Sequence, residues 1–334
     1  MQFDGKLPKI VCIVAPGGKN VIGNLAKIYK DILEDEGICC IYIDSKPYLK
    51  LKMFLDLIRE RNNYDCIHVH TSGLLGDIPL IWTYIISKLF KKKTIITYHC
   101  GSPDLILRKT SFLLNIFFNS ADAITVPSNF SRDILLNYNK NIYKKLFILP
   151  NIVDVLKWQY LELRKDNTMA MTVSSINKWY ICRKGLNLFA ETAKILTEFD
   201  FYIIGKYDNS IGYLKKIAPS NLHFTGYIPD EELLKLYNLS GVYCQFSISE
   251  SFGYALAEAM SCGCVPVVTR NASLPEVVGE VGYYIDNNDP KEAAEQIKRA
   301  ANSNLSRQSR HRIVESFSAA NVKQNLLNII YGVF

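Results

Sequence analysis

The stretch Ser247-Ile-Ser-Glu-Ser-Phe-Gly-Tyr-Ala-Leu-Ala-Glu-Ala-Met-Ser-Cys-Gly263, followed by Val265-Pro-Val-Val268, decides the fold class of this chain. Two serines and a carboxylate come first, and a run rich in Ala, Leu and Met then predicts a helix. Gly263 stands where helices commonly end. The short apolar segment Val265 to Val268 predicts the next buried strand. A helix that leads directly into a buried strand is typical of an α/β protein.

The start of this predicted helix offers a site for an anion. Backbone N–H groups there have no intrahelical partner, and Gly253 would let a phosphate approach them closely. Glu250 precedes the helix and Glu258 lies within it. A fully helical span would separate them by ~12 Å, more than the ~5–9.5 Å of a hydrolase carboxylate pair. We therefore expect the two carboxylates to hold hydroxyl groups of one elongated ligand, such as a nucleotide-sugar.

These residues also form a composite motif. Glu250-x7-Glu258 encloses Phe252-Gly253, and Gly263-x-x-Pro266-Val-Val268 and Pro275-Glu276 follow. The composite resembles the donor-site signature of retaining glycosyltransferases of the glycogen synthase and family 4 type. The resemblance covers nearly the whole chain and is closest from 169 to 290. It implies the GT-B fold, in which two Rossmann-like, doubly wound α/β domains face each other across a cleft and a C-terminal helix crosses back to the first domain.

The 334 residues suggest two domains, and strands alternate with helices in both halves. We expect an N-terminal acceptor-binding domain over 1–155, a donor-binding domain over 168–315 and the crossing-back helix over 316–334. The polar residues from about 155 to 168 are interpreted as a linker. The predicted strands include 9–15, 38–43, 64–70, 94–101, 123–127, 169–173, 201–204, 222–224 and 242–246, and the predicted helices include 21–36, 78–90, 105–118, 185–197, 230–239, 289–300 and 313–330.

Four residues of the first half are candidate site residues. The loop that contains Gly17 and Gly18 follows the first strand; it is not GxGxxG, which disfavours a nicotinamide site. By the resemblance, a glycine loop here lies against the donor sugar and acceptor, although a tight turn would also explain it. His99 ends a strand, where ligands bind in open parallel sheets, and the resemblance gives it a contact with the donor sugar. Ser128 starts a helix, which capping alone explains; the resemblance adds a sugar or acceptor contact.

His68 and His70 lie two apart on one predicted strand, so their side chains share a face. A metal site would need further ligands, and the sequence suggests none. No Asp-x-Asp motif occurs either. We therefore expect neither a metal nor another cofactor.

The motif Arg183-Lys184-Gly185 predicts a helix start that places cations beside backbone N–H groups. Fixed cations can stabilise the charge that builds on a departing diphosphate. Lys184 matches the family's lysine before glycine. The family often carries an arginine several residues earlier, where this chain has Ser174-Ser-Ile176. Either Arg183 takes over that role or the diphosphate is held more weakly.

Composition excludes several classes. The net charge of +7 is modest for 334 residues, and no base-reading motif accompanies it, which argues against nucleic acid. Nine scattered cysteines without a CxxC pair argue against a disulfide framework or a zinc site. We expect no signal peptide and no transmembrane helix, hence a cytoplasmic protein. The basic, apolar segment 105–118 could contact the inner membrane face or border the acceptor cleft. Nothing indicates an oligomeric state.

The sequence thus predicts a retaining, metal-independent hexosyltransferase that moves a sugar from a nucleotide-diphospho-sugar to a glycan, lipid-linked or small-molecule hydroxyl. A nucleotide-sugar epimerase or hydrolase, and a catalytically inactive sugar-nucleotide-binding protein, stay open as alternatives. By the resemblance, Glu250 binds the sugar and Glu258 the ribose. Lys184 and Arg183 hold the diphosphate, and His99 approaches the sugar from the first domain. Phe252 and Gly253 supply backbone contacts near the helix start, where Tyr254 also binds the donor.

Overall fold

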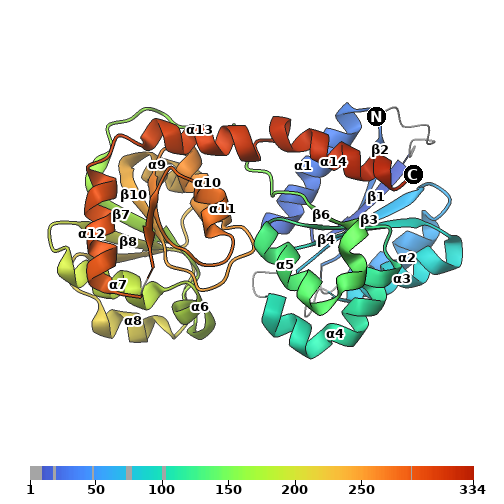
Figure 1. Ribbon diagram of the computed structural model, residues 1–334, viewed down its shortest axis with the longest axis horizontal. Coiled ribbons are helices and arrows are strands. Elements are labelled where there is room, and N and C mark those ends of the chain that lie inside the picture. The colour runs from blue at the N-terminus through green and yellow to red at the C-terminus, as the bar shows by residue number, and fades with distance from the viewer. Residues whose placement is uncertain (1–9, 18–19, 47–48, 73–76, 100–102, 287) are drawn as a thin grey trace. The chain divides into compact units, whose positions relative to one another are not determined.

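The computed structural model describes residues 10–17, 20–46, 49–72, 77–99, 103–286 and 288–334. The chain divides into two compact units (Figure 1). Unit 1 combines Met1–Ile152 with Ala319–Phe334, and unit 2 is Val153–Ser318. Each unit contains one six-stranded sheet in which every strand pair is parallel. The predicted fold class, α/β with two doubly wound domains, is confirmed.

The sheet of unit 1 has the strand order β2-β1-β3-β4-β5-β6. The order reverses between β1 and β3, and ligands bind beside such a switch point, at the carboxyl ends of the strands. The strands are β1 Ile10–Ala15, β2 Cys39–Asp44, β3 Cys66–Thr71, β4 Lys93–Tyr98, β5 Ala123–Val126 and β6 Leu146–Ile148. The helices are α1 Val21–Asp35, α2 Lys50–Arg59, α3 Asp77–Phe90, α4 Pro103–Ser120, α5 Asn129–Tyr138, the 3-10 helix η3 Lys140–Lys145 and α14 Ala319–Gly332.

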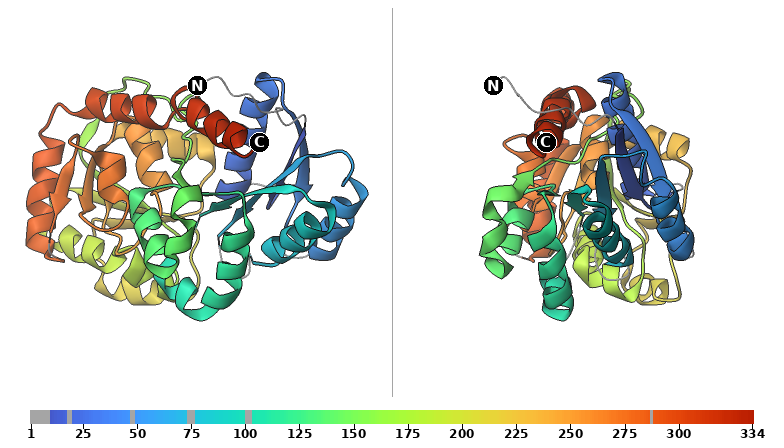
Figure 2. Two further views of the ribbon diagram at one scale, coloured as in Figure 1. Left: turned by 45° about the vertical axis from the view of Figure 1, so that its right-hand side comes forward. Right: turned by 90° about the vertical axis from the view of Figure 1, so that its right-hand side faces the viewer.

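Helices cover both faces of the sheet of unit 1 (Figure 2). Alternating strand residues belong to two separate cores, one on each face. Cys12 and Val14 of β1 belong to the core under α2, α3, α4 and α5. Val11 and Ile13 belong to the core under α1 and α14. The last helix of the chain therefore completes unit 1, and it lies beside α1, to whose C-cap it is tied by an ion pair between Lys323 and Glu36.

The sheet of unit 2 has the order β12-β11-β10-β7-β8-β9. Its strands are β7 Asp166–Val173, β8 Asp200–Ile204, β9 Leu222–Gly226, β10 Ser240–Gln245, β11 Val265–Thr269 and β12 Tyr283–Ile285. Its helices are α6 Lys178–Arg183, α7 Leu186–Ile195, α8 Ile211–Ile217, α9 Asp230–Leu239, α10 Tyr254–Ser261, α11 Leu274–Val278, α12 Pro290–Ala301 and α13 Ser306–Phe317.

The single helix predicted over 313–330 is wrong, because the chain breaks at Ser318 into α13 and α14. Ser318 is extended, with φ −70° and ψ 158°. The carbonyl of Phe317 accepts a hydrogen bond from the Val153 N–H (2.8 Å) instead of continuing the helix. The buried Phe317 ring packs edge-on against Phe252, with ring centroids 5.2 Å apart. Helical periodicity continues through the break, so the pattern alone conceals it.

The segment interpreted as a linker from about 155 to 168 packs on unit 2. The Trp158 side chain is buried and meets the Tyr237 ring edge-on. The Arg310 guanidinium donates to the carbonyls of Trp158 (2.7 Å) and Val155 (3.1 Å). β7 begins at Asp166, within the expected linker. The polar composition of the segment hides these anchors, since a single tryptophan carries most of the burial.

Candidate active site

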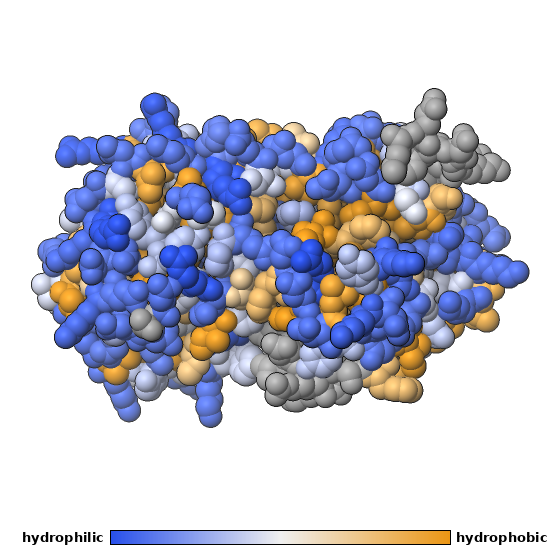
Figure 3. Space-filling view, viewed as in Figure 1, coloured by the Kyte–Doolittle hydropathy of each residue, from blue (hydrophilic) through white to orange (hydrophobic). Residues whose placement is uncertain are grey.

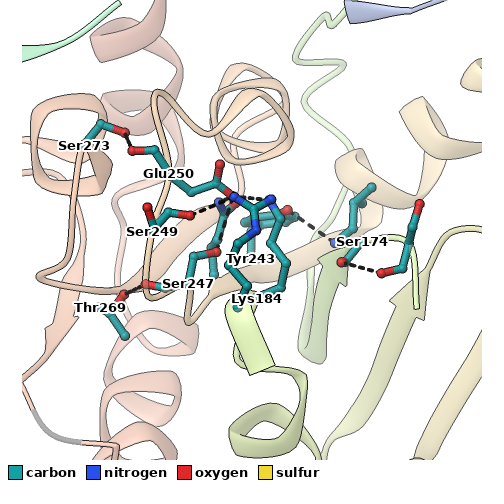
Figure 4. A network of polar contacts seen from close by, with 12 residues as sticks. Ser174, Lys184, Tyr243, Ser247, Ser249, Glu250, Thr269 and Ser273 are labelled. Atoms are coloured by element: carbon teal, nitrogen blue, oxygen red, sulfur yellow. Dashed lines mark hydrogen bonds and ion pairs between the residues drawn. The ribbon is translucent and has the colours of Figure 1, made fainter. Parts of the chain in front are cut away.

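The loop between β10 and α10 is fixed by side chains that bind its backbone (Figure 4). The Thr269 hydroxyl donates to the Ser247 carbonyl (2.7 Å), and the Ser273 hydroxyl donates to the Glu250 carbonyl (3.0 Å). Both hydroxyls are buried, so water competes little for these bonds. The loop that carries Glu250 is therefore fastened by Thr269 at the end of β11 and by Ser273 just after that strand.

Glu250 is buried and its carboxylate forms an ion pair with the Lys184 ammonium (Figure 4). The same oxygen accepts from Gln245 Nε2 (3.2 Å) and Ser247 Oγ (3.4 Å). A buried carboxylate needs such partners, because an unpaired charge in the interior is costly. Gln245 and Ser247 were not predicted from the sequence. Their position at the end of β10 is the signal that could have found them.

Gly185 is the N-cap of α7, so the motif stands at a helix start as predicted, but Arg183 and Lys184 also end the short helix α6, which was not predicted. Gly185, with φ +65°, turns the chain into α7, and a Cβ there would lie 2.2 Å from the Phe246 carbonyl oxygen. The Arg183 Nη1 donates to the Ser249 carbonyl (3.1 Å). The turn thus brings both cations to the Glu250 loop, although each cation lies 66 residues before its partner in the chain.

Gly253 begins α10 with φ +96°, a conformation that disfavours any residue with a Cβ. No side-chain cap hydrogen bond is formed at this described helix start, a place where helices leave backbone N–H groups without an intrahelical partner. The Phe252 ring is buried among Tyr254 and Phe317, which makes its side chain part of the core. The contacts expected of Phe252 and Gly253 would therefore come from their backbone, and they stay a prediction.

Glu258 lies in α10 in a different environment from Glu250. Burial raises the pKa of its carboxyl to about 8, while nearby Lys157 and a hydrogen bond from Trp158 oppose that shift. The side chain therefore carries a proton at neutral pH and can both donate and accept a hydrogen bond. Glu250 is paired with a cation, whereas burial disfavours the charged form of Glu258, a difference that the sequence did not reveal.

In unit 1, the Gly17 N–H donates to the Asp44 carboxylate (2.7 Å), and a Cβ at Gly17 would overlap that carboxylate. Gly18, the second predicted glycine, lies outside the described residues. Asp44 was not predicted, although a carboxylate at the end of β2 is a signal of the same kind as His99 after β4. His99 is half-buried, with its Nε2 atom 3.1 Å from Nδ1 of His70.

Ser128 is the N-cap of α5, where its Oγ accepts from the Ser131 N–H (3.2 Å). The side chain is buried, and its predicted contact with sugar or acceptor stays a prediction. Ser174, at the place of the family's arginine, donates its hydroxyl to the Ser175 carbonyl (2.9 Å).

The described residues contain neither a cluster of metal-binding side chains nor a helix that could span a membrane. Within 10–17, 20–46, 49–72, 77–99, 103–286 and 288–334, no group of three or more His, Cys, Asp or Glu side chains could hold a metal ion. Across the same residues, no helix combines the length and the apolar character that crossing a membrane requires.

Both halves of the chain match models of glycosyltransferase families. Residues 12–156 match the family model described as Glycosyltransferase Family 4, and residues 160–317 match Glycosyl transferases group 1. N-acetyl-alpha-D-glucosaminyl L-malate synthase of Bacillus anthracis is 24% identical over 340 residues, 92% of this chain and 86% of that protein. O-antigen chain mannosyltransferase B of Escherichia coli is 49% identical over 69 residues, 20% of this chain and 18% of that one.

A solved structure shares the fold along nearly the whole chain. The structure of Anabaena HepE in complex with UDP and glucose matches with a TM-score of 0.74 at 16% identity, and the match covers 96% of this chain and 98% of that chain. The resemblance stated from the signature is therefore confirmed, and the chain belongs to the family 4 glycosyltransferases, hexosyltransferases of the GT-B fold.

Proposed function

We propose that this glycosyltransferase uses a nucleotide-diphospho-sugar, retains the configuration of the transferred sugar and needs no metal ion. The observation that carries the proposal is the pairing of Lys184 with Glu250 beside the start of α10. Two cations and the Glu250 carboxylate meet near a helix N-terminus in unit 2. HepE binds UDP and glucose, which supports a donor of the same kind here.

The diphosphate would lie at the start of α10, against Lys184 and Arg183. The helix dipole favours an anion there, and Gly253 presents no Cβ to keep it away. In the transfer, the bond from the anomeric carbon to the phosphate oxygen breaks, and negative charge develops on that oxygen. The two cations would stabilise this charge in place of a metal ion. Arg183 would thereby supply the charge that Ser174 lacks.

The two carboxyls of the signature would hold the two ends of the donor. Glu250, ionised beside Lys184, would accept hydrogen bonds from hydroxyls of the sugar. Glu258, protonated at neutral pH, would donate to one ribose hydroxyl and accept from the other. In front-face transfer, the acceptor oxygen bonds to the anomeric carbon and its proton passes to the departing phosphate oxygen. His99 is proposed as a contact of the sugar, supplied by unit 1.

Thermal stabilisation by UDP, GDP, ADP and their sugar conjugates tests the donor site. A ligand present at a hundred times its Kd adds about 2.7 kcal/mol to the stability of the folded state. We expect one diphosphate to be preferred, and Lys184→Met to remove most of its effect. The surface variant Lys194→Met, on α7, is the control. Absence of stabilisation by every diphosphate would refute the proposal and favour an inactive relative.

An NMR time course of the product tests the mechanism. A retained anomeric configuration is expected, and an inverted product would overturn the front-face route. Release of nucleotide at full rate without any acceptor would instead indicate a hydrolase. Activity that survives a chelator at an unchanged rate is expected if Lys184 and Arg183 replace a metal ion.

The acceptor is proposed to be a glycan or a lipid-linked saccharide, with peripheral contact to an anionic membrane. Leu51 and Leu55 of α2 and Phe112 of α4 are exposed, and Lys50 and Lys52 flank Leu51. Hydrophobic patches among hydrophilic residues are visible on the face shown in Figure 3. Apolar side chains beside lysines suit an anionic lipid surface. Co-sedimentation with anionic vesicles, lost in Leu51→Ser/Leu55→Ser, is expected; equal sedimentation of both proteins would exclude this contact.

A further inference from the structure

Strands β3 and β4 bring three imidazoles together inside unit 1. His68 and His70 lie on one face of β3, with ring centroids 4.5 Å apart, and His99 follows β4. The rings of His70 and His99 are nearly parallel at 11°, and His70 Nδ1 lies 3.1 Å from His99 Nε2. One of these two nitrogens carries the shared proton. The surrounding hydrogen bonds decide which one.

His68 takes no part in this bond. Its Nε2 lies 2.7 Å from the Thr97 hydroxyl, which in turn lies 2.7 Å from the Thr125 hydroxyl. His68 donates to Thr97 and Thr97 donates to Thr125, because this direction leaves no proton on the buried and unpartnered Nδ1 of His68. His68 therefore forms its hydrogen bond within the buried sheet and not with His99.

His70 has only one paired nitrogen. Its side chain is buried, and its Nε2 has no hydrogen-bond partner among the residues that the structure describes. A proton on Nε2 would leave a buried N–H unpaired, which is among the more costly defects in a folded protein. A proton on Nδ1 is paired with His99 and leaves only a lone pair without a partner. The geometry therefore places the proton of His70 on Nδ1.

His99 must then accept at Nε2 and carry its own proton on Nδ1. Burial lowers the pKa of His99 to about 4, and a hydrogen bond with Asn151 opposes that shift, so the ring is neutral and holds one proton near pH 7. The Asn151 Oδ1 is buried and has no other partner among the residues that the structure describes. Without a ligand, the Asn151 amide oxygen is therefore the acceptor nearest to the Nδ1–H of His99. A hydroxyl oxygen of a ligand could take its place.

We propose that His70 is a positioning residue: it donates from Nδ1 to His99 Nε2, fixes the ring of His99, and so makes His99 present an Nδ1–H donor to the transferred sugar. The statement about the sugar rests on the proposed function, whereas the tautomer of His99 does not. His70 touches neither sugar nor nucleotide in this scheme. It acts only through His99.

The tautomer can be measured without any substrate. The chain has five histidines, so ¹⁵N-histidine labelling gives a spectrum in which each ring can be assigned by substitution. In the wild type, the ¹⁵N shifts of His99 are expected to show the proton on Nδ1. His70→Phe removes the donor, and His99 is expected to shift toward the Nε2–H form. His70→Asn supplies an N–H donor again and is expected to restore Nδ1–H.

The matched control is His68→Phe, which removes an imidazole from the same cluster and leaves the bond between His70 and His99 in place. It should leave the tautomer of His99 unchanged. If His99 keeps Nδ1–H in His70→Phe, or if His68→Phe changes it as much as His70→Phe, the proposal is overturned. Circular dichroism like that of the wild type, together with a cooperative unfolding transition, shows that each variant is folded.

Ligand binding tests the connection to function. His70→Phe is expected to weaken the nucleotide-sugar about fivefold in Kd, a loss the size of one hydrogen bond, and to leave the nucleoside diphosphate unchanged. Equal weakening of both ligands would refute a role through the sugar. If no nucleotide-sugar binds the wild type, the proposed function fails, while the tautomer measurement still decides the role of His70.

Discussion

The protonated carboxyl of Glu258 should make the stability of unit 2 depend on pH. Its pKa rises from an ordinary value of 4.5 to about 8 because the group is buried. Between these two values the unfolded chain has lost the proton and the folded protein keeps it, so stability falls as pH rises. The slope from this one group is about 1.4 kcal/mol per pH unit, and the loss across the whole window stays below about 5 kcal/mol.

Glu258→Gln replaces the protonated acid with a neutral group of similar shape. The variant should lose this slope, and its free energy of unfolding relative to wild type should therefore rise steadily from about pH 5 to about pH 8. Urea unfolding at several pH values measures the difference. Fluorescence is a suitable signal because Trp158 is buried beside this carboxyl.

The exposed Glu295→Gln on α12 controls for the change in net charge. Parallel stability curves for wild type and Glu258→Gln would refute the reasoning, since they would mean that the folded protein holds Glu258 as ionised as the unfolded chain does. A difference that grows with falling pH would contradict its sign.

Three further substitutions test the site and its support. Gly253→Ala should lower the free energy of unfolding in urea by about 1–3 kcal/mol, because φ is +96° and the new Cβ would lie 3.2 Å from Leu274 Cδ2. The control Gly212→Ala, in α8, should be neutral or stabilising, because a Cβ there would have no neighbour within 4 Å. Lys184→Met should lower the free energy of unfolding by about 2–4 kcal/mol, because it leaves Glu250 buried without its cation. Adding Glu250→Gln should restore stability but not transfer activity. A double variant that regains activity would contradict the assigned roles. Arg310→Lys should cost about 1–3 kcal/mol, measured in the same way, since one ammonium cannot reach both the Trp158 and Val155 carbonyls.

Much of the fold follows from the sequence because strands and helices alternate with clear periodicity. The helix predicted over 230–239 matches α9 at both ends, and the strand predicted over 201–204 lies within β8. The break at Ser318 could not be predicted, because it depends on a hydrogen bond from Val153, far away in the chain. Long-range contacts decide such details, and local patterns do not contain them.

The candidate site was predictable in its residue types but less so in its physics. Glu250, Lys184 and Gly253 were named from spacing, and the structure brings Glu250 and Lys184 into contact. The proton on Glu258 could not be predicted, because burial beside Trp158 arises only in the fold. Nor could the pairing of His70 with His99, which depends on the register of β3 against β4.

The last helix gives the chain an unusual order of assembly. During synthesis, the first 152 residues of unit 1 emerge, then all of unit 2, and only afterwards Ala319–Phe334. Until then, the apolar face of β1 formed by Val11 and Ile13 lacks the cover that Leu326 and Ile330 later provide. Unit 2 is continuous and can fold while the chain is still growing, whereas unit 1 must wait until Ala319–Phe334 has been made. A ribosome that stalls before codon 319 would therefore release a protein with one finished half and one exposed sheet, which is a natural target for chaperones and proteases.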